Sequence, residues 1–274
     1  MNDPCQIGNG DRGPAFLTAI KVANRESHTV ATVSPSSSHP GIWPPDEPLA
    51  AAKIVALFAA ARRLRADSNA GATGKPLRGK NLALLLAKPT SREVSPLHRA
   101  ARDLGARVAE VPFETGASGQ EDIGTLARLL GRMYDAIDCD ALPLSTFRSI
   151  EKEAGVPVYA GLGLDDHPAR VIADLLTLCD LGSPQAVKTR IVFLGDPRTP
   201  RGSIFLAAAG ELGFALQVAE AGHGASNEAA YVVDATRPWT WSLHAEGRPI
   251  EEARRSVNHR CVIQTVLLDT IPRG

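Results

Sequence analysis

The stretch GRMYDAIDCDALPLSTFRSIEKEAGVPVYAGLGLDDHPARVIADLLTLCD, which runs from Gly131 to Asp180, decides the fold of this chain. Two short apolar runs, Ala136–Asp138 and Val156–Tyr159, alternate in it with helical patterns, of which Ala169–Cys179 is the longest. Strands and helices that alternate in this way form βαβ units with parallel strands. The stretch therefore predicts an α/β fold.

The segment Asp165-Asp166-His167-Pro168 lies within this stretch, between an expected strand and an expected helix. The two aspartates are candidate N-caps, and proline is favoured in the first turn of a helix. This arrangement predicts that His167 lies at the open N-terminus of the helix. There it either faces a ligand or simply caps the helix.

The alternation continues on both sides of the stretch. Upstream we expect a helix over 48–65, strands over 81–87 and 107–111, and a helix over 121–130; downstream we expect strands over 190–196, 215–219 and 231–234, and helices over 201–213 and 251–268. Two blocks of alternation predict two doubly wound, parallel-sheet (Rossmann-like) domains, with a C-terminal helix that crosses back to the first domain. In such folds ligands bind in the crevice at the C-terminal ends of the strands.

Four segments follow from the pattern. Residues 1–45 are rich in Gly, Ser and Pro without apolar periodicity, which predicts a flexible extension. Residues 46–182 are expected to form the first domain and 183–250 the second. Residues 251–274 are expected to form the helix that returns to the first domain.

The composition excludes several classes of function. Thirty basic and thirty acidic residues cancel, so the chain has no overall field for nucleic acid or anionic lipid. Four cysteines without a CxxC pair indicate a reducing compartment, and no apolar run approaches membrane-spanning length, so we expect a cytoplasmic protein. The histidines lack metal-ligand spacing, and no GxGxxG follows a strand, so we expect neither a metal nor an organic cofactor.

A turn rich in hydroxyl groups follows the expected strand over 81–87. It contains Thr90, Ser91 and Arg92, and the helix after it begins at Ser95-Pro96. Free backbone N–H groups, two hydroxyls and a guanidinium would together suit a small anion. An ordinary capped turn between a strand and a helix is the alternative.

Several segments together resemble the aspartate/ornithine carbamoyltransferase family, most closely its ornithine branch. They are Gly131-Arg132-Met133-Tyr134-Asp135-Ala136-Ile137, Ala154-Gly155-Val156-Pro157-Val158, Ala160-Gly161-Leu162, His167-Pro168 and Ala173-Asp174-Leu175-Leu176-Thr177. The resemblance covers about Leu49 to the C-terminus. It implies transfer of a carbamoyl group from carbamoyl phosphate to an amine, without metal or organic cofactor, in a trimer. Residues 46–182 would then bind carbamoyl phosphate and 183–250 an amino-acid-like amine.

The phosphate-binding motif of the family is only partly retained. Its Ser-Thr-Arg-Thr-Arg loop falls on Thr90-Ser91-Arg92-Glu93-Val94, which keeps two hydroxyls and the first arginine. A later phosphate-binding arginine falls at or near Asp140. Glu93 and Asp140 would each face a phosphate dianion, at a cost of about 4 kcal/mol for a like-charge pair at about 4 Å and an effective dielectric near 20. Alternatively, Asp140 is only a solvated turn residue.

Other motifs of the family are also altered. Its His-Pro-x-Gln falls on His167-Pro168-Ala169-Arg170, which keeps the histidine that polarises the carbamoyl carbonyl and places Arg170 where the family has glutamine. Its His-Cys-Leu-Pro turn falls on Ala235-Thr236-Arg237-Pro238, which introduces Arg237. Either new arginine could replace the lost one, although Arg170 could instead pair with Asp166 or Asp174.

Three hypotheses of function follow. The first is a divergent carbamoyltransferase for an amine other than ornithine, with Thr90, Ser91 and Arg92 on the phosphate and His167 on the carbonyl. The second is an inactive member of the same fold that serves as a binding or regulatory subunit. The third is a different reaction on an anionic small molecule in the same cleft.

Overall fold

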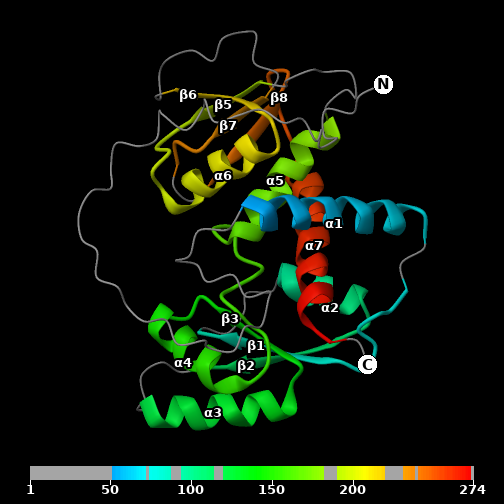
Figure 1. Cartoon of the computed structure of the whole chain (residues 1–274), viewed down its shortest axis with the longest axis vertical. Helices are drawn as coiled ribbons and strands as arrows, with labels where there is room; N and C mark the ends of the chain where they lie inside the picture. Colours follow the sequence, from blue (N-terminus) through cyan, green and yellow to red (C-terminus); the bar gives the residue numbers. More distant parts are fainter. Residues whose placement is uncertain are drawn as a thin grey trace.

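Two β-sheets lie at opposite ends of the molecule, with long helices between them (Figure 1). The computed structural model describes residues 51–71, 74–87, 94–113, 120–181, 190–219, 231–237 and 240–272. The predicted extension over 1–45 lies outside these residues. Within the described residues, no helix is both long and apolar enough to cross a bilayer.

The first sheet is wholly parallel. It consists of β1 (Asn81–Leu86), β2 (Arg107–Pro112), β3 (Ala136–Asp140) and β4 (Val158–Tyr159), in the order β2-β1-β3-β4. Successive residues of β1 alternate between two cores: Leu82, Leu84 and Leu86 belong to one, and Ala83 and Leu85 to the other. A continuous apolar run therefore produces a strand that is buried on both faces.

Helices cover both faces of this sheet. Helices α3 (Gln120–Met133) and α4 (Leu144–Ala154) pack on one face, and α2 (Pro96–Asp103) packs on the other. Helix α2 begins as predicted at Ser95, whose hydroxyl accepts a hydrogen bond from the N–H of His98. Helix α4 ends at Gly155, which adopts the left-handed conformation typical of a helix C-terminus.

The second sheet is mixed. Its strands are β5 (Arg190–Leu194), β6 (Ala215–Ala219), β7 (Tyr231–Asp234), β8 (Ser242–Ala245) and β9 (Arg248–Pro249), in the order β6-β5-β7-β8-β9. The first three are parallel, as predicted, and the last two are antiparallel. Helix α6 (Pro200–Glu211) connects β5 to β6. The antiparallel end arises because the segment over 235–241 is too short for the crossover that a parallel strand requires.

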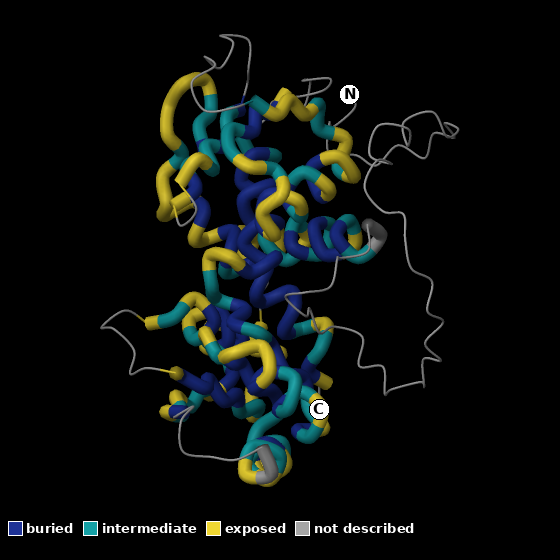
Figure 2. The backbone as a smooth tube through the Cα atoms, turned by 90° about the vertical axis from the view of Figure 1, so that its left-hand side faces the viewer, coloured by how far each residue is buried: buried dark blue, intermediate teal, exposed yellow. Residues whose placement is uncertain are grey.

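Three helices join the two sheets: α1 (Ala51–Asn69), α5 (Pro168–Leu181) and α7 (Glu252–Thr270). Every residue of α5 from Pro168 to Leu178 is buried, and the tube in Figure 2 shows this buried axis between the two ends of the molecule. Helix α7 packs on α1, α2 and α5. Near its end, Thr270 is hydrogen-bonded to Tyr159 of β4. The α/β fold class and the returning C-terminal helix are thus confirmed.

Candidate active site

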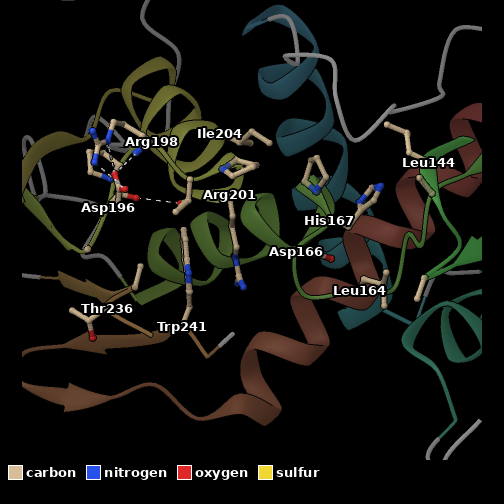
Figure 3. Close-up of a pocket in the computed structure, with 18 of the residues that line it drawn as sticks. Leu144, Leu164, Asp166, His167, Asp196, Arg198, Arg201, Ile204, Thr236 and Trp241 are labelled. Atoms are coloured by element: carbon tan, nitrogen blue, oxygen red, sulfur yellow. Dashed lines mark hydrogen bonds and ion pairs between the residues drawn. The ribbon is translucent and has the colours of Figure 1, made fainter. Parts of the chain in front are cut away.

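A cleft of about 1330 Å³ lies between the two sheets, where the C-terminal ends of β3, β5 and β7 meet (Figure 3). In each sheet the order in which successive strands are added reverses, between β1 and β3 in the first and between β5 and β7 in the second. Ligands of doubly wound folds bind at such a switch point. The lining of the cleft includes Ala141, Leu144, Leu164, Asp166, His167, Gly195, Asp196, Arg198, Arg201, Ile204, Val218 and Trp241.

The backbone is unusual on both walls. Ala141, directly after β3, has a φ of 55°, a left-handed conformation that is rare outside glycine and asparagine. Gly195, directly after β5, has a φ of 136°, and a Cβ there would lie 2.7 Å from the carbonyl oxygen of Ala235. Only glycine allows the ends of β5 and β7 to approach this closely at the cleft.

His167 lies at the start of α5 and lines the cleft. Its Nδ1 accepts a hydrogen bond from the backbone N–H of Ala169 at 3.1 Å. Burial, with a smaller contribution from His259, lowers the pKa of His167 to about 3, so the imidazole is neutral at pH 7. Because Nδ1 is the acceptor, the proton is on Nε2, which makes that nitrogen a hydrogen-bond donor. The capping position and the cleft-facing position are therefore compatible.

Asp138 is a buried carboxylate that the sequence analysis did not select. It lies in β3, and its Oδ1 accepts hydrogen bonds from the N–H groups of Gly161 (2.9 Å) and Leu162 (3.0 Å). Burial raises the pKa of Asp138 to about 7, although the two hydrogen bonds oppose this shift. Asp138 thus anchors the loop that leads to His167. The sequence signal was an aspartate between apolar residues of a buried strand.

A buried cluster of charges lies at the junction of α5, α6 and α7. Asp174, fully buried in α5, accepts hydrogen bonds from Arg255 at 3.0 and 3.2 Å and from Arg201 at 3.1 Å. Arg170 lies 3.6 Å from Asp174 and donates a hydrogen bond to Glu252. Three guanidinium groups thus surround one carboxylate, and this cluster ties together three helices.

The structure describes some of the predicted site residues. Arg170 is buried and pairs with Asp165, Asp174 and Glu252, so the predicted pairing with Asp174 is present. Asp140 is half-buried at the end of β3, and desolvation raises its pKa. Arg237 is exposed after β7. Within the described chain, neither arginine pairs with Asp140.

Four predicted residues, Thr90, Ser91, Arg92 and Glu93, lie outside the described residues. Pro238, at the predicted turn, does so too. The anion-binding roles of these residues, and of Arg170 and Arg237, remain predictions.

Trp241 and Arg201 are lining residues that the sequence did not single out as a pair. The guanidinium of Arg201 lies 4.2 Å from the centre of the Trp241 ring, and Trp241 also packs against Phe193 and Phe205. These contacts make Trp241 a packing residue of the second domain. The stack fixes the second wall of the cleft, because Arg201 is also bound to Asp174.

Comparison with known proteins agrees with this architecture. Residues 46–180 match the carbamoyl-phosphate-binding domain of the aspartate/ornithine carbamoyltransferases. The ornithine carbamoyltransferase of Thermus thermophilus has a TM-score of 0.57 at 19% identity, with 82% of this chain and 96% of that chain covered. The aspartate transcarbamoylase of Trypanosoma cruzi, solved in complex with phosphate, has a TM-score of 0.56 at 15% identity, with 82% and 93% covered.

The match to the ornithine carbamoyltransferase of Pyrococcus furiosus spans 62% of this chain and only 63% of that chain, at 22% identity and a TM-score of 0.48. This chain has the two-domain α/β fold that the Thermus thermophilus and Trypanosoma cruzi enzymes share. Residues 46–180 therefore form a carbamoyl-phosphate-binding domain of the aspartate/ornithine carbamoyltransferase family.

Proposed function

We propose that this protein transfers a carbamoyl group from carbamoyl phosphate to a primary amine other than ornithine, in the cleft between the two sheets. Residues 46–182 would bind the carbamoyl phosphate and 183–250 the amine. The predicted cytoplasmic location and trimeric assembly belong to the same proposal.

The observation that carries this proposal is the state of His167. A neutral imidazole whose Nδ1 accepts a backbone N–H has an Nε2–H donor, and His167 lines the cleft. A fixed donor of this kind suits the carbonyl oxygen of carbamoyl phosphate, where negative charge develops during attack. The low pKa also keeps His167 uncharged, so the imidazole does not form an ion pair with the phosphate group in place of a hydrogen bond to the carbonyl oxygen.

The reaction itself needs little more than positioning. The amine nitrogen attacks the carbonyl carbon, a C–N bond forms, the C–O bond to phosphate breaks, and phosphate leaves with the electron pair while the amine loses a proton. We propose that Thr90, Ser91 and Arg92 stabilise the leaving phosphate and that His167 polarises the carbonyl. Orientation and electrostatic stabilisation are the large terms in such a transfer.

Calorimetric titration with carbamoyl phosphate, with inorganic phosphate as the control, tests the first half of the proposal. We expect saturable binding that Arg92→Ala abolishes and that His167→Gln changes by less than about fivefold. Turnover is then measured as phosphate release and as carbamoylated product by mass spectrometry, with L-ornithine, L-aspartate and primary alkylamines as acceptors. His167→Gln should lower kcat by about 100-fold, whereas His98→Gln, in α2 and outside the cleft lining, should leave it unchanged.

A binding or regulatory subunit without turnover is the second candidate, and Asp140 favours it. This half-buried carboxylate lies at the end of β3, and Arg170 is paired with Asp174 and Glu252 rather than with Asp140. A carboxylate near the phosphate would oppose binding of a dianion. The absence of heat at millimolar carbamoyl phosphate would favour this second candidate and reject the transfer.

A further inference from the structure

Two large aliphatic side chains are exposed on opposite walls of the cleft. Leu144, the first residue of α4, is 44% exposed, and Val218, in β6, is 48% exposed. Both line the same cavity. An apolar ligand that covers these side chains removes their apolar surface from water, which favours binding.

The apolar lining extends beyond these two residues. Leu164 lies on the same side of the cleft as Leu144, while Ile204 and Trp241 belong to the second-sheet side (Figure 3). Apolar side chains therefore line the space from both sides of the cleft. A concave site with apolar walls and a few polar groups is typical of sites for small molecules with an apolar body.

The charged groups of the lining are mostly neutralised within the protein. Asp196 and Arg198 pair with each other at 3.0 Å, and Arg201 pairs with Asp174 at 3.1 Å. Asp166 is the remaining charged residue of this lining, and it forms no ion pair with any residue that the structure describes. A carboxylate beside His167 complements an ammonium group, which is the usual form of a primary amine at pH 7.

From these walls and this carboxylate we infer that the amine acceptor is carried on an apolar, aliphatic or aromatic skeleton. Asp166 and Leu144 extend the amine site of 183–250 into the first domain. Asp166 binds the incoming ammonium group next to His167, and one proton passes from that group to water so that the neutral amine can attack. The side chains of Leu144 and Val218 close on the skeleton from opposite walls. This inference rests on the proposed function, because it names the class of acceptor for the same cleft. It predicts discrimination against amines with a second charge at the far end.

Two amines of equal size provide the test. n-Pentylamine and 1,4-diaminobutane have the same number of non-hydrogen atoms, but the second ends in another ammonium group. We expect n-pentylamine to bind at least tenfold more tightly in calorimetric titrations, with and without saturating carbamoyl phosphate. Leu144→Asn and Val218→Thr should each lower the affinity for n-pentylamine about fivefold to tenfold. Each should change the affinity for 1,4-diaminobutane less than twofold. Leu129→Asn is the matched control, because Leu129 is 53% exposed on α3 and does not line the cleft.

Equal or tighter binding of 1,4-diaminobutane would overturn the inference, and so would equal effects of Leu144→Asn and Leu129→Asn. Titration of the same samples with carbamoyl phosphate tests the proposed function separately. Preference for n-pentylamine without carbamoyl phosphate binding would reject the transfer and keep the apolar amine site. Carbamoyl phosphate binding without that preference would reject the apolar site and keep the transfer.

Discussion

Replacement of Asp174 by asparagine tests the charge cluster that joins α5, α6 and α7. The change keeps the size of the side chain and one oxygen acceptor, but it removes the carboxylate that faces three buried guanidinium groups. Arg170 and Arg255 retain Glu252 as a partner, and Arg255 also retains the carbonyl oxygen of Trp241. Arg201 loses its ion-pair partner.

The expected loss follows from these partners. Removing one member of a buried ion pair typically costs about 3 to 5 kcal/mol, because the other charge remains buried. Since two of the three arginines keep Glu252, we expect the lower end, about 3 kcal/mol. In a chain of this size that loss lowers the midpoint of thermal unfolding by about 6 to 12 °C.

Urea and thermal unfolding of Asp174→Asn and Asp103→Asn provide the comparison. Asp103 faces Arg260 at 3.4 Å, and the two side chains are 49% and 41% exposed, so this control should cost less than about 1 kcal/mol. In the double variant with Arg201→Met, an apolar side chain replaces the unpaired guanidinium and should restore at least half of the loss. Equal losses for Asp174→Asn and Asp103→Asn would refute the role of the cluster.

Three further predictions concern pH and packing. Burial lowers the pKa of His167 and of His259 to about 3, so between about pH 3 and 6.5 the unfolded chain binds more protons than the folded chain. The free energy of unfolding should therefore fall as the pH drops through this window, by about 1.4 kcal/mol per pH unit for each histidine. In urea titrations at several pH values, His259→Gln should halve that slope. Asp138 has the opposite effect, since its pKa is raised to about 7 and the folded chain binds the extra proton between about pH 4 and 7. The stability that this group contributes falls as the pH rises. In the same titrations, Asp138→Asn should therefore make the free energy of unfolding fall more steeply as the pH is lowered. A Cβ on Gly131 would lie 1.7 Å from a backbone oxygen of α4, so Gly131→Ala should lower the free energy of unfolding by about 2 kcal/mol. In the same helix, a Cβ on Gly124 would have its nearest neighbour at 3.6 Å, so Gly124→Ala should be neutral or stabilising by up to about 1 kcal/mol. Similar thermal midpoints for the two variants would contradict this prediction.

Much of the fold could be predicted because buried parallel strands are nearly continuous apolar runs. The strands expected over 81–87 and 190–196 correspond to the buried strands β1 and β5 within two residues at each end. The strands expected over 107–111 and 215–219 correspond equally well to β2 and β6, although these two lie at sheet edges and are largely exposed or half-buried. The expected helix over 251–268 corresponds to α7. The start of α5 at Pro168 also followed from local rules, because proline favours the first turn of a helix.

The hairpin of β8 and β9 was not predicted, although its turn carries a recognisable signal. Glu246 and Gly247 both have positive φ angles, 49° and 74°, as a two-residue hairpin turn requires. The flanking strands are only four and two residues long, so no alternation of apolar and polar residues could develop. Strand length, rather than composition, hid this element.

The charge cluster could not be predicted for a different reason. Asp174 binds side chains that are 27 and 81 positions away in the sequence. Short-range spacing carries no information about such pairs, and an aspartate within an apolar helix suggests at most a neighbour one turn away. Only the packing of three helices brings Arg201 and Arg255 to the same carboxylate.

Helix α5 connects this cluster to the chemistry of the cleft. His167 and Asp174 are seven residues apart, about 10 Å along the helix axis, so one rigid element holds the candidate donor at its start and the cluster two turns later. Arg201 binds Asp174 and also stacks on Trp241 in the opposite wall of the cleft. The position of His167 relative to that wall therefore depends on the same contacts that hold the two sheets together. Asp174→Asn should consequently lower the affinity for n-pentylamine as well as the stability of the fold, although Asp174 is fully buried and not part of the cleft lining.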